Sequence, residues 1–166
     1  MIGLSIKKVF PLDPYDDNQL DMIKEFINNS GIESHYFNML LDMKNNLSKE
    51  QYLDIKKQGN EIEELLIVEE DSKIRGYCHL LGEKDLKIYK LLFPDNDTHM
   101  KSIISSIMNY VQSELDFEEI FIELNSNDNI NGKKLLDLGF ESLGDEFGHT
   151  IFLKEKGAEI EVQRKI

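Results

Sequence analysis

The sequence has few residues of the kinds that cross-link a chain, divide it or carry it into a membrane. Of its 166 residues, one is cysteine, three are proline and none is tryptophan. The lone Cys78 excludes an intramolecular disulfide, and no basic N-terminal segment followed by an apolar run marks a signal peptide. The longest apolar runs, such as 65–68, have four residues or fewer, whereas a span of the bilayer needs about 20. We therefore expect a cytoplasmic protein that does not enter a membrane.

Arginine is also scarce, and the charge is predominantly acidic. The chain has 32 aspartates and glutamates against 19 lysines and arginines, which gives a formal net charge of −13. Such a surface repels phosphate backbones at long range, so nucleic acid is not expected as a partner. The acidic residues are spread along the sequence, which is typical of charge that maintains solubility. Steering of a cationic substrate such as an amine is the alternative interpretation.

The spacing of apolar residues predicts the secondary structure of most of the chain, because strands alternate with period two and helices repeat every three or four residues. We expect strands at 5–10, 65–70, 73–81, 84–93, 120–125, 140–143 and 150–154. We expect helices at about 20–30, at 98–114 and at 132–138, and two short helices within 33–57. The three strands between 65 and 93 are joined by turn-forming pairs, which predicts an antiparallel meander.

Individual residues indicate where some of these elements end. Ser48 followed by Gln51 matches a capping box at a helix start. Gly31 is a stop signal after the first helix. No repeat, low-complexity block or linker divides the sequence, so we expect one domain over residues 1–156. Residues 157–166 form a charged C-terminal tail or an edge strand in this interpretation.

Two segments resemble the GNAT superfamily of acetyltransferases, and the order of elements resembles it over about residues 4–155. The segment NINGKKLLDLGFESLG, Asn129 to Gly144, resembles the family's asparagine to Leu-Gly-Phe stretch, where a short helix leads into the sixth strand. Gly139 there suits a left-handed helix stop and Phe140 suits the core position that follows. The segment LLFPDND, Leu91 to Asp97, resembles the end of the family's fourth strand.

The resemblance implies a fold and an activity. The fold is α/β (α+β), with a mixed, mostly antiparallel sheet of about seven strands flanked by helices on both faces. The activity is transfer of an acetyl group from acetyl-CoA to an amine of a small molecule or a peptide. The cofactor would lie against backbone groups of the fourth strand and the helix after it, at Leu91, Leu92, Phe93, Thr98, His99, Met100 and Lys101.

The cofactor turn departs from the family's pattern. That pattern has Arg or Gln followed by Gly-x-Gly or Gly-x-Ala, because glycine lets backbone N–H groups approach a pyrophosphate at a helix N-terminus. The corresponding segment 95–101 contains no glycine and no arginine. Asp97 or Thr98 can cap the helix, and Lys101 can neutralise one phosphate as a point charge. The alternative hypothesis is a non-catalytic binding or assembly module with the same fold, such as a homodimer, that has lost coenzyme A binding.

Candidates for acid-base chemistry lie on the central strands. Glu123 and Tyr89 are the catalytic candidates, with Asn125 and His79 as further polar residues on these strands. Each has a structural alternative: a solvated or paired carboxylate for Glu123, a core residue with its hydroxyl at the rim for Tyr89. The family's general-acid tyrosine has no counterpart here, because Leu135 and Leu136 occupy that stretch.

Other chemistries find no support in the sequence. The four histidines are scattered, and no His-x-x-x-His or Cys-x-x-Cys spacing predicts a metal site. No Gly-x-Ser-x-Gly elbow, Walker loop or Gly-x-Gly-x-x-Gly segment occurs. The usual hydrolases, nucleoside triphosphatases and dinucleotide-binding enzymes are therefore not expected. Cys78 lies within an apolar strand and is expected to be a small buried residue rather than a nucleophile.

Overall fold

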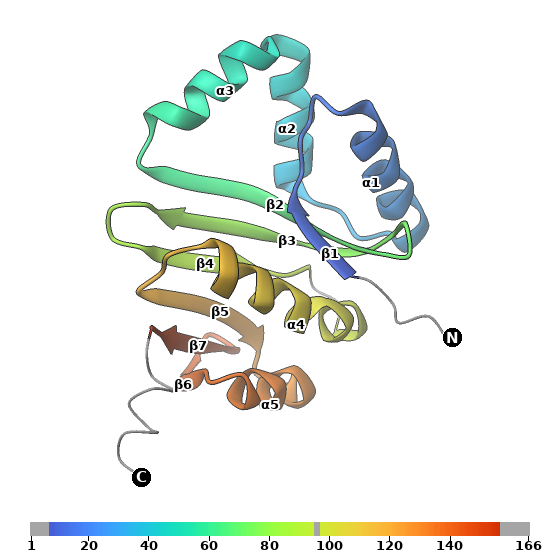
Figure 1. The fold of residues 1–166 in the computed structure, drawn as a ribbon. Coiled ribbons are helices and arrows are strands. Elements are labelled where there is room, and N and C mark those ends of the chain that lie inside the picture. Colours follow the sequence, from blue (N-terminus) through green and yellow to red (C-terminus); the bar gives the residue numbers. More distant parts are fainter. Residues whose placement is uncertain (1–6, 95–96, 157–166) are drawn as a thin grey trace, which may run out of the picture.

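A seven-stranded sheet forms the centre of the molecule in the computed structural model, which describes residues 7–94 and 97–156 (Figure 1). The strand order is β1-β2-β3-β4-β5-β7-β6, and only β4 and β5 pair in parallel. This mixed, mostly antiparallel sheet confirms the predicted fold class. The strands are β1 (Lys7–Pro11), β2 (Glu61–Glu70), β3 (Lys73–Glu83), β4 (Ile88–Leu92), β5 (Glu119–Asn125), β6 (Glu141–Glu146) and β7 (His149–Glu155).

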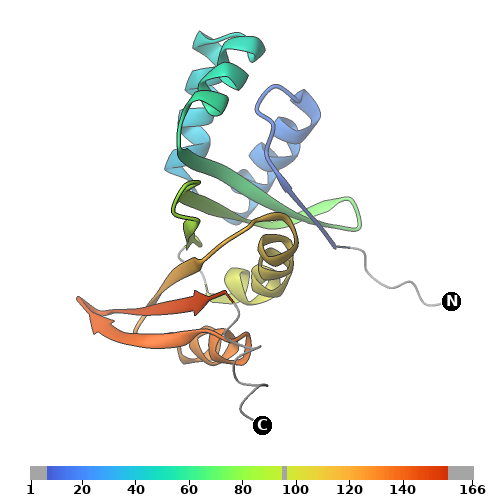
Figure 2. The ribbon, with the colours of Figure 1, turned by 60° about the vertical axis from the view of Figure 1, so that its left-hand side comes forward.

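Five helices lie on the two faces of this sheet (Figure 1, Figure 2). Three of them gather near β1 and β2, while the other two lie against the opposite face. Figure 2 also shows the β6–β7 hairpin projecting at the end of the sheet. The helices are α1 (Asp17–Ser30), α2 (His35–Asn46), α3 (Lys49–Gln58), α4 (Asp97–Glu114) and α5 (Asn129–Asp137).

Alternation along the strands separates two hydrophobic cores. On β2, Leu66 and Val68 point toward α4, while Leu65 and Ile67 point toward the N-terminal helices. The core under α4 and α5 extends across the sheet from β2 to β7. The core under α1–α3 draws its buried strand residues from β2 and β3 alone. The face of the sheet that carries α1–α3 is therefore left without a helical layer over β4, β5 and β7, in the part of the chain that the structure describes.

The residues that end the helices behave as the sequence predicts. Ser48 and Gln51 form both hydrogen bonds of a capping box at the start of α3. Gly31 ends α1 in the left-handed conformation, with φ of 71°. Gly139 follows α5 with φ of 95°, and Phe140 after it is buried in the core under α4. These positions confirm the stop signals.

Some predicted boundaries are wrong. The run 84–93 is not one strand, because residues 84–87 form the turn between β3 and β4, in which the Lys87 N–H bonds to the Glu83 carbonyl. Lys87 takes a positive φ of 56° in this turn. Helix α5 begins at Asn129 instead of residue 132, because the side chain of Asp128 caps it. Residues 5 and 6 of the predicted first strand and the tail 157–166 lie outside the described residues.

Gly82 provides a test of the packing between β3 and β4. A Cβ atom at this position would lie 2.6 Å from the Ile88 carbonyl oxygen and would also collide with the Tyr89 ring. We expect Gly82→Ala to lower the free energy of unfolding by about 1–3 kcal/mol, because a backbone atom cannot move aside cheaply. Gly59→Ala is the control, since its Cβ would meet nothing closer than the Glu61 nitrogen at 3.7 Å. Equal urea midpoints for the two variants would contradict this packing.

Candidate functional site

The parallel pairing of β4 with β5 ends before β5 does. Its last paired residues are Leu91 and Ile122, yet β5 continues to Asn125. On its other side β4 stays paired with β3 as far as Leu92. The backbone of β4 after Leu91 and the neighbouring backbone of β5 thus lie outside the ladder that joins these two strands. Such groups remain available to hydrogen-bond an extended ligand.

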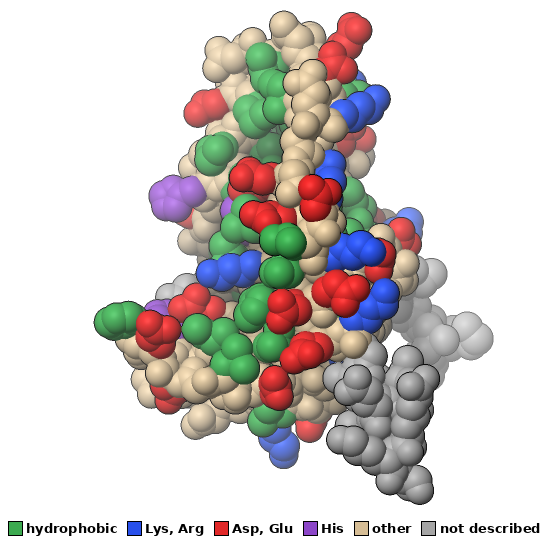
Figure 3. All heavy atoms as spheres, turned by 90° about the vertical axis from the view of Figure 1, so that its left-hand side faces the viewer, with side chains coloured by type: hydrophobic (Ala, Val, Ile, Leu, Met, Phe, Trp, Pro, Cys, Tyr) green, Lys and Arg blue, Asp and Glu red, His purple; other side chains and the backbone are tan. Residues whose placement is uncertain are grey.

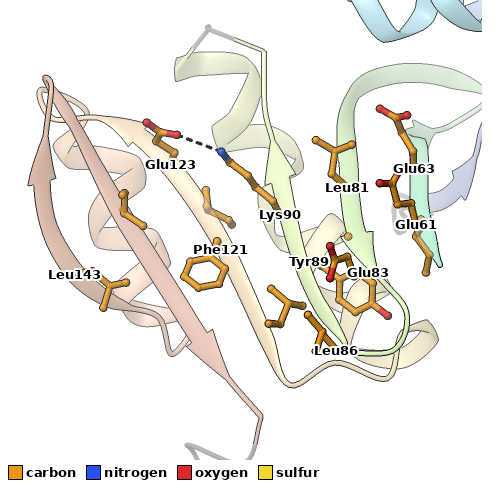
Figure 4. Close-up of a pocket in the computed structure, with 15 residues that line it drawn as sticks. Glu61, Glu63, Leu81, Glu83, Leu86, Tyr89, Lys90, Phe121, Glu123 and Leu143 are labelled. Atoms are coloured by element: carbon orange, nitrogen blue, oxygen red, sulfur yellow. Dashed lines mark ion pairs between the residues drawn. The ribbon is translucent and has the colours of Figure 1, made fainter.

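A cavity of about 710 Å³ lies beside this opening, on the face that α1–α3 leave uncovered (Figure 4). Its floor is apolar and comes from four adjacent strands, with Leu81, Ile88, Phe121 and Ile151. Carboxylates stand around that floor. Those that line the cavity are Glu61, Glu63, Glu83 and Glu123. An apolar cavity with a few charged groups at its edge is the usual form of a small-molecule site.

Glu123 lies at the end of the cavity next to the opening. It follows Ile122, the last β5 residue paired with β4. Its carboxylate is 3.6 Å from the Lys90 ammonium and 3.9 Å from His149 Nδ1, and Figure 4 shows the pair with Lys90 across the strands. Lys90 is a site residue that the sequence analysis missed, although its position between Tyr89 and Leu91 places it on the uncovered face.

Tyr89 lies on the other face of the sheet. Its ring is buried in the core under α4, and its hydroxyl donates to the Asp116 carbonyl oxygen at 3.4 Å. Burial raises the pKa of this hydroxyl, and the Asp116 carboxylate adds to the effect. Tyr89 and Glu123 are both among the residues that line the cavity, but the Tyr89 ring packs in the core and its hydroxyl is bound to the Asp116 carbonyl oxygen. This position matches the structural alternative, a core tyrosine with its hydroxyl at the rim.

The other polar candidates are engaged in local contacts. His79 Nε2 lies 2.7 Å from Glu63 Oε2, and its ring stacks on Tyr36 with centroids 4.4 Å apart. Burial, and then the Glu63 carboxylate, raise the pKa of the Tyr36 hydroxyl. The Asn125 side chain accepts from the Asn127 N–H at 3.0 Å and so stabilises the turn after β5.

Three lysines gather around the first turns of α4. Lys134 Nζ donates to the Lys101 carbonyl oxygen at 3.1 Å, and Lys7 Nζ lies 3.4 Å from the Ser102 carbonyl oxygen. Lys101 itself is exposed. The sequence analysis named only Lys101, because the other two come from β1 and α5, which are distant in the chain. Lys134 lies within the segment that resembles the family, so its charge was a signal that could have been used.

The structure describes the other predicted cofactor residues to different extents. The Met100 side chain is buried, with 3% of its surface exposed, so only its backbone can face a ligand. Thr98 and His99 belong to the first turn of α4, and their side chains lie outside the described residues. Leu91 is fully buried, and Phe93 packs partly buried against the same core. Leu92 is half-buried at the end of β4.

Among the described residues, no group of three or more histidine, cysteine or acidic side chains is placed to hold a metal ion. No described helix has the length and apolar character needed to cross a bilayer. The Cys78 side chain is completely buried, and burial raises the pKa of its thiol. A thiol in such surroundings is a poor nucleophile.

The arrangement of strands and helices is shared with solved acetyltransferases. No protein-family model and no curated protein sequence matches the chain. The structure of FdhC, described as a nucleotide-linked sugar GNAT, superposes with a TM-score of 0.58 and 14% identity over 96% of this chain and 92% of that chain. The chain has the GNAT fold.

Two further structures agree with this GNAT fold. The Campylobacter jejuni N-acetyltransferase PseH, in complex with acetyl coenzyme A, has a TM-score of 0.58 and 10% identity over 91% of this chain and 99% of that chain. A Salmonella typhimurium acetyl transferase that modifies an N-terminal serine of a 50S ribosomal subunit protein has a TM-score of 0.57 and 9% identity, over 90% and 94%. At these identities the likeness establishes the fold of this chain.

The burial of Cys78 gives a direct test of the core behind the opening. We expect iodoacetamide to label the folded protein at least about 100-fold more slowly than the protein in denaturant, because the thiol is inaccessible and its pKa is raised. The labelling of free glutathione under both conditions corrects for the effect of denaturant on the reagent. Rapid labelling of the folded protein would show that the sheet opens beneath α4.

Proposed function

We propose that this protein transfers an acyl group from a coenzyme A thioester to an amine. The observation that carries the proposal is the early end of the β4–β5 ladder beside a cavity with a carboxylate at its edge. The fold is shared with acetyltransferases, one of them solved with acetyl coenzyme A. The proposal includes a cytoplasmic location and an acceptor that is a small molecule or a peptide amine.

Backbone groups of β4 would hold the pantetheine arm of the cofactor. From Leu91 to Phe93, the backbone groups beyond the last pair with Ile122 lie outside the ladder with β5 and offer N–H and C=O groups. An arm that contains amide groups can add to this edge as a further strand would. The bound cofactor supplies an activated acyl group, and the chain positions an amine against it.

The lysines around α4 are suited to the phosphates of the cofactor. An 18-residue helix carries partial positive charge at its N-terminus. Lys101 and Lys134 add two full charges beside its first turns, and Lys7 adds a third. These charges offset the absence of arginine in the turn 95–101, although they do not replace the close backbone approach that glycine allows.

In this proposal, Glu123 takes a proton from the attacking amine. It lies on the cavity side of the opening, where its carboxylate already accommodates the ammonium group of Lys90. As the amine nitrogen bonds to the acyl carbon, the carbon–sulfur bond breaks, the amine proton passes to Glu123 and then to solvent, and coenzyme A leaves as the thiol form after protonation by water. Positioning of the two reactants supplies much of the rate in such a direct attack.

The second candidate function is a GNAT-fold binding or assembly module that does not hold coenzyme A. The specific observation in its favour is the turn 95–101, which lacks every glycine of the usual pattern. Cofactor binding separates the two functions.

The first prediction concerns this binding. We expect acetyl-CoA to raise the melting temperature, since a ligand at 100 times its dissociation constant adds about 2.7 kcal/mol of stability. The double variant Lys101→Glu, Lys134→Glu should lose about tenfold or more in affinity, because charged contacts to phosphate contribute about 1.5–3 kcal/mol each. The melting temperature of the variant without ligand is its own reference, because Lys134 lies in the last turn of α5, where a negative charge is unfavourable.

The control for charge is Lys24→Glu on the exposed surface of α1, which should respond to acetyl-CoA like the original protein. If millimolar acetyl-CoA produces no shift in the original protein, the enzyme hypothesis fails for this cofactor. An equal shift in the double variant would show that the phosphates bind elsewhere.

The second prediction concerns the proton acceptor. We expect Glu123→Gln to lower kcat/KM by about 100-fold or more, because general bases contribute about that much. Thiol release from acetyl-CoA over a panel of amines measures this. Tyr89→Phe is the control, since the Tyr89 ring packs in the core under α4 and its hydroxyl donates to the Asp116 carbonyl oxygen, and it should stay within about threefold. A larger loss of kcat/KM in Tyr89→Phe than in Glu123→Gln would indicate that Tyr89, and not Glu123, takes part in proton transfer.

A further inference from the structure

One amine of the chain itself lies in the cavity. Lys90 is the only lysine among the described residues that line it. The strand register pairs Lys90 directly with Phe121, so its methylene stem lies beside that ring on the apolar floor. Figure 4 shows the ammonium group extending from β4 toward Glu123, whose carboxylate is 3.6 Å from Lys90 Nζ. Figure 3 shows the same face of the molecule, where a strip of apolar side chains runs between charged ones.

This amine lies where the proposed reaction needs an acceptor. Lys90 immediately precedes Leu91, the last β4 residue that pairs with β5, and Glu123 immediately follows Ile122, its partner. Both side chains line the cavity. The proposed function places the thioester against the β4 backbone beyond this last pair. The two strands therefore bring an amine and a proton acceptor to the place where the acyl group would be held.

The contact between Lys90 and Glu123 contributes little to the stability of the fold. The two side chains are 48% and 36% exposed. Ion pairs between groups that water reaches add little to folding, because both charges are already solvated when they are apart. The amine is therefore held beside the carboxylate without being shielded from a reagent in the cavity.

We infer that Lys90 is acylated by the thioester that its own chain binds, an inference that rests on the proposed acyl transfer. The ammonium group loses one proton to Glu123, which passes it to solvent. The neutral amine then bonds to the acyl carbon and loses a second proton to solvent, while the carbon–sulfur bond breaks. The leaving thiolate takes a proton from solvent. The products are an amide at Lys90 Nζ, free coenzyme A and one released proton.

Lys87 provides a matched comparison within the same chain. Its side chain is 41% exposed and pairs with the Asp116 carboxylate at 2.7 Å, so it is also a partly exposed lysine with an acidic partner. It lies in the turn before β4 and does not line the cavity. The hydrogen bond to Asp116 raises the pKa of Lys87, which lowers the intrinsic reactivity of this amine. Acetic anhydride needs no binding site and therefore measures the intrinsic reactivity of both lysines.

Peptide mass spectrometry of the full-length protein tests the inference after incubation with acetyl-CoA and no added amine. We expect the ratio of acetylated Lys90 to acetylated Lys87 to be at least about tenfold higher with acetyl-CoA than with acetic anhydride, because only the bound thioester is positioned. Equal ratios for the two reagents would overturn the inference. The fraction acetylated per minute should not change with protein concentration, and a proportional increase would contradict attack within one chain.

Replacement of the proton acceptor tests the chemistry. We expect Glu123→Gln to slow the acetylation of Lys90 by acetyl-CoA about 100-fold and to leave that of Lys87 unchanged. The control Glu25→Gln removes a carboxylate from the exposed surface of α1 away from the cavity, and Lys90 should react in it as in the original protein. Equal rates at Lys90 in the two variants would show that Glu123 does not take the proton, which overturns the inference.

The melting temperature and the turnover of an added amine separate this inference from the proposed function. If acetyl-CoA raises the melting temperature and butylamine is acetylated, but Lys90 is modified no faster than acetic anhydride predicts, self-acylation is overturned and the proposed function stands. If acetyl-CoA neither raises the melting temperature nor favours Lys90, both are overturned. Preferential modification of Lys90 that requires Glu123 supports the inference even before an external acceptor is known.

Discussion

The short parallel ladder between β4 and β5 is the constraint on which the site depends. Two consecutive strands can lie parallel only if a crossover connects them, and α4 is that crossover. The stripe of Ile103, Ile107 and Val111 buries α4 against the sheet. Because the helix begins where β4 ends, its N-terminus lies near the point where the ladder stops. Topology therefore brings together a helix N-terminus, unpaired strand backbone and the Glu123 carboxylate from separate parts of the chain.

The unequal helical cover of the two faces determines where a second substrate can approach. On one face, α4 and α5 bury a core that reaches from β2 to β7. On the other, α1–α3 bury only the part near β1–β3. A flat and apolar remainder would be unfavourable in water. Here Leu81, Ile88 and Phe121 form a concave floor whose charged edges keep it hydrated.

Most of the fold was predictable because local patterns and the tertiary structure agree. The capping box at Ser48, the stop at Gly139 and the stripe of α4 each act within a few residues, and such signals are readable from one sequence. The face of Tyr89 was readable too, since it alternates with Lys90 and shares its side of the strand with Leu91. The lysines around α4 were not, because the packing of β1 and α5 against α4 decides which charges meet.

The positions of the charges on the two faces of the sheet matter more for binding than the strongly acidic composition does. The three lysines around α4 lie on the face that this helix covers, and the carboxylates of the cavity lie on the other. A phosphate-bearing thioester and an amine acceptor would then approach the same backbone opening from opposite sides, each drawn by charge of the opposite sign. Separation of charge by the sheet, more than the net charge of −13, is what would let one chain gather two oppositely charged substrates.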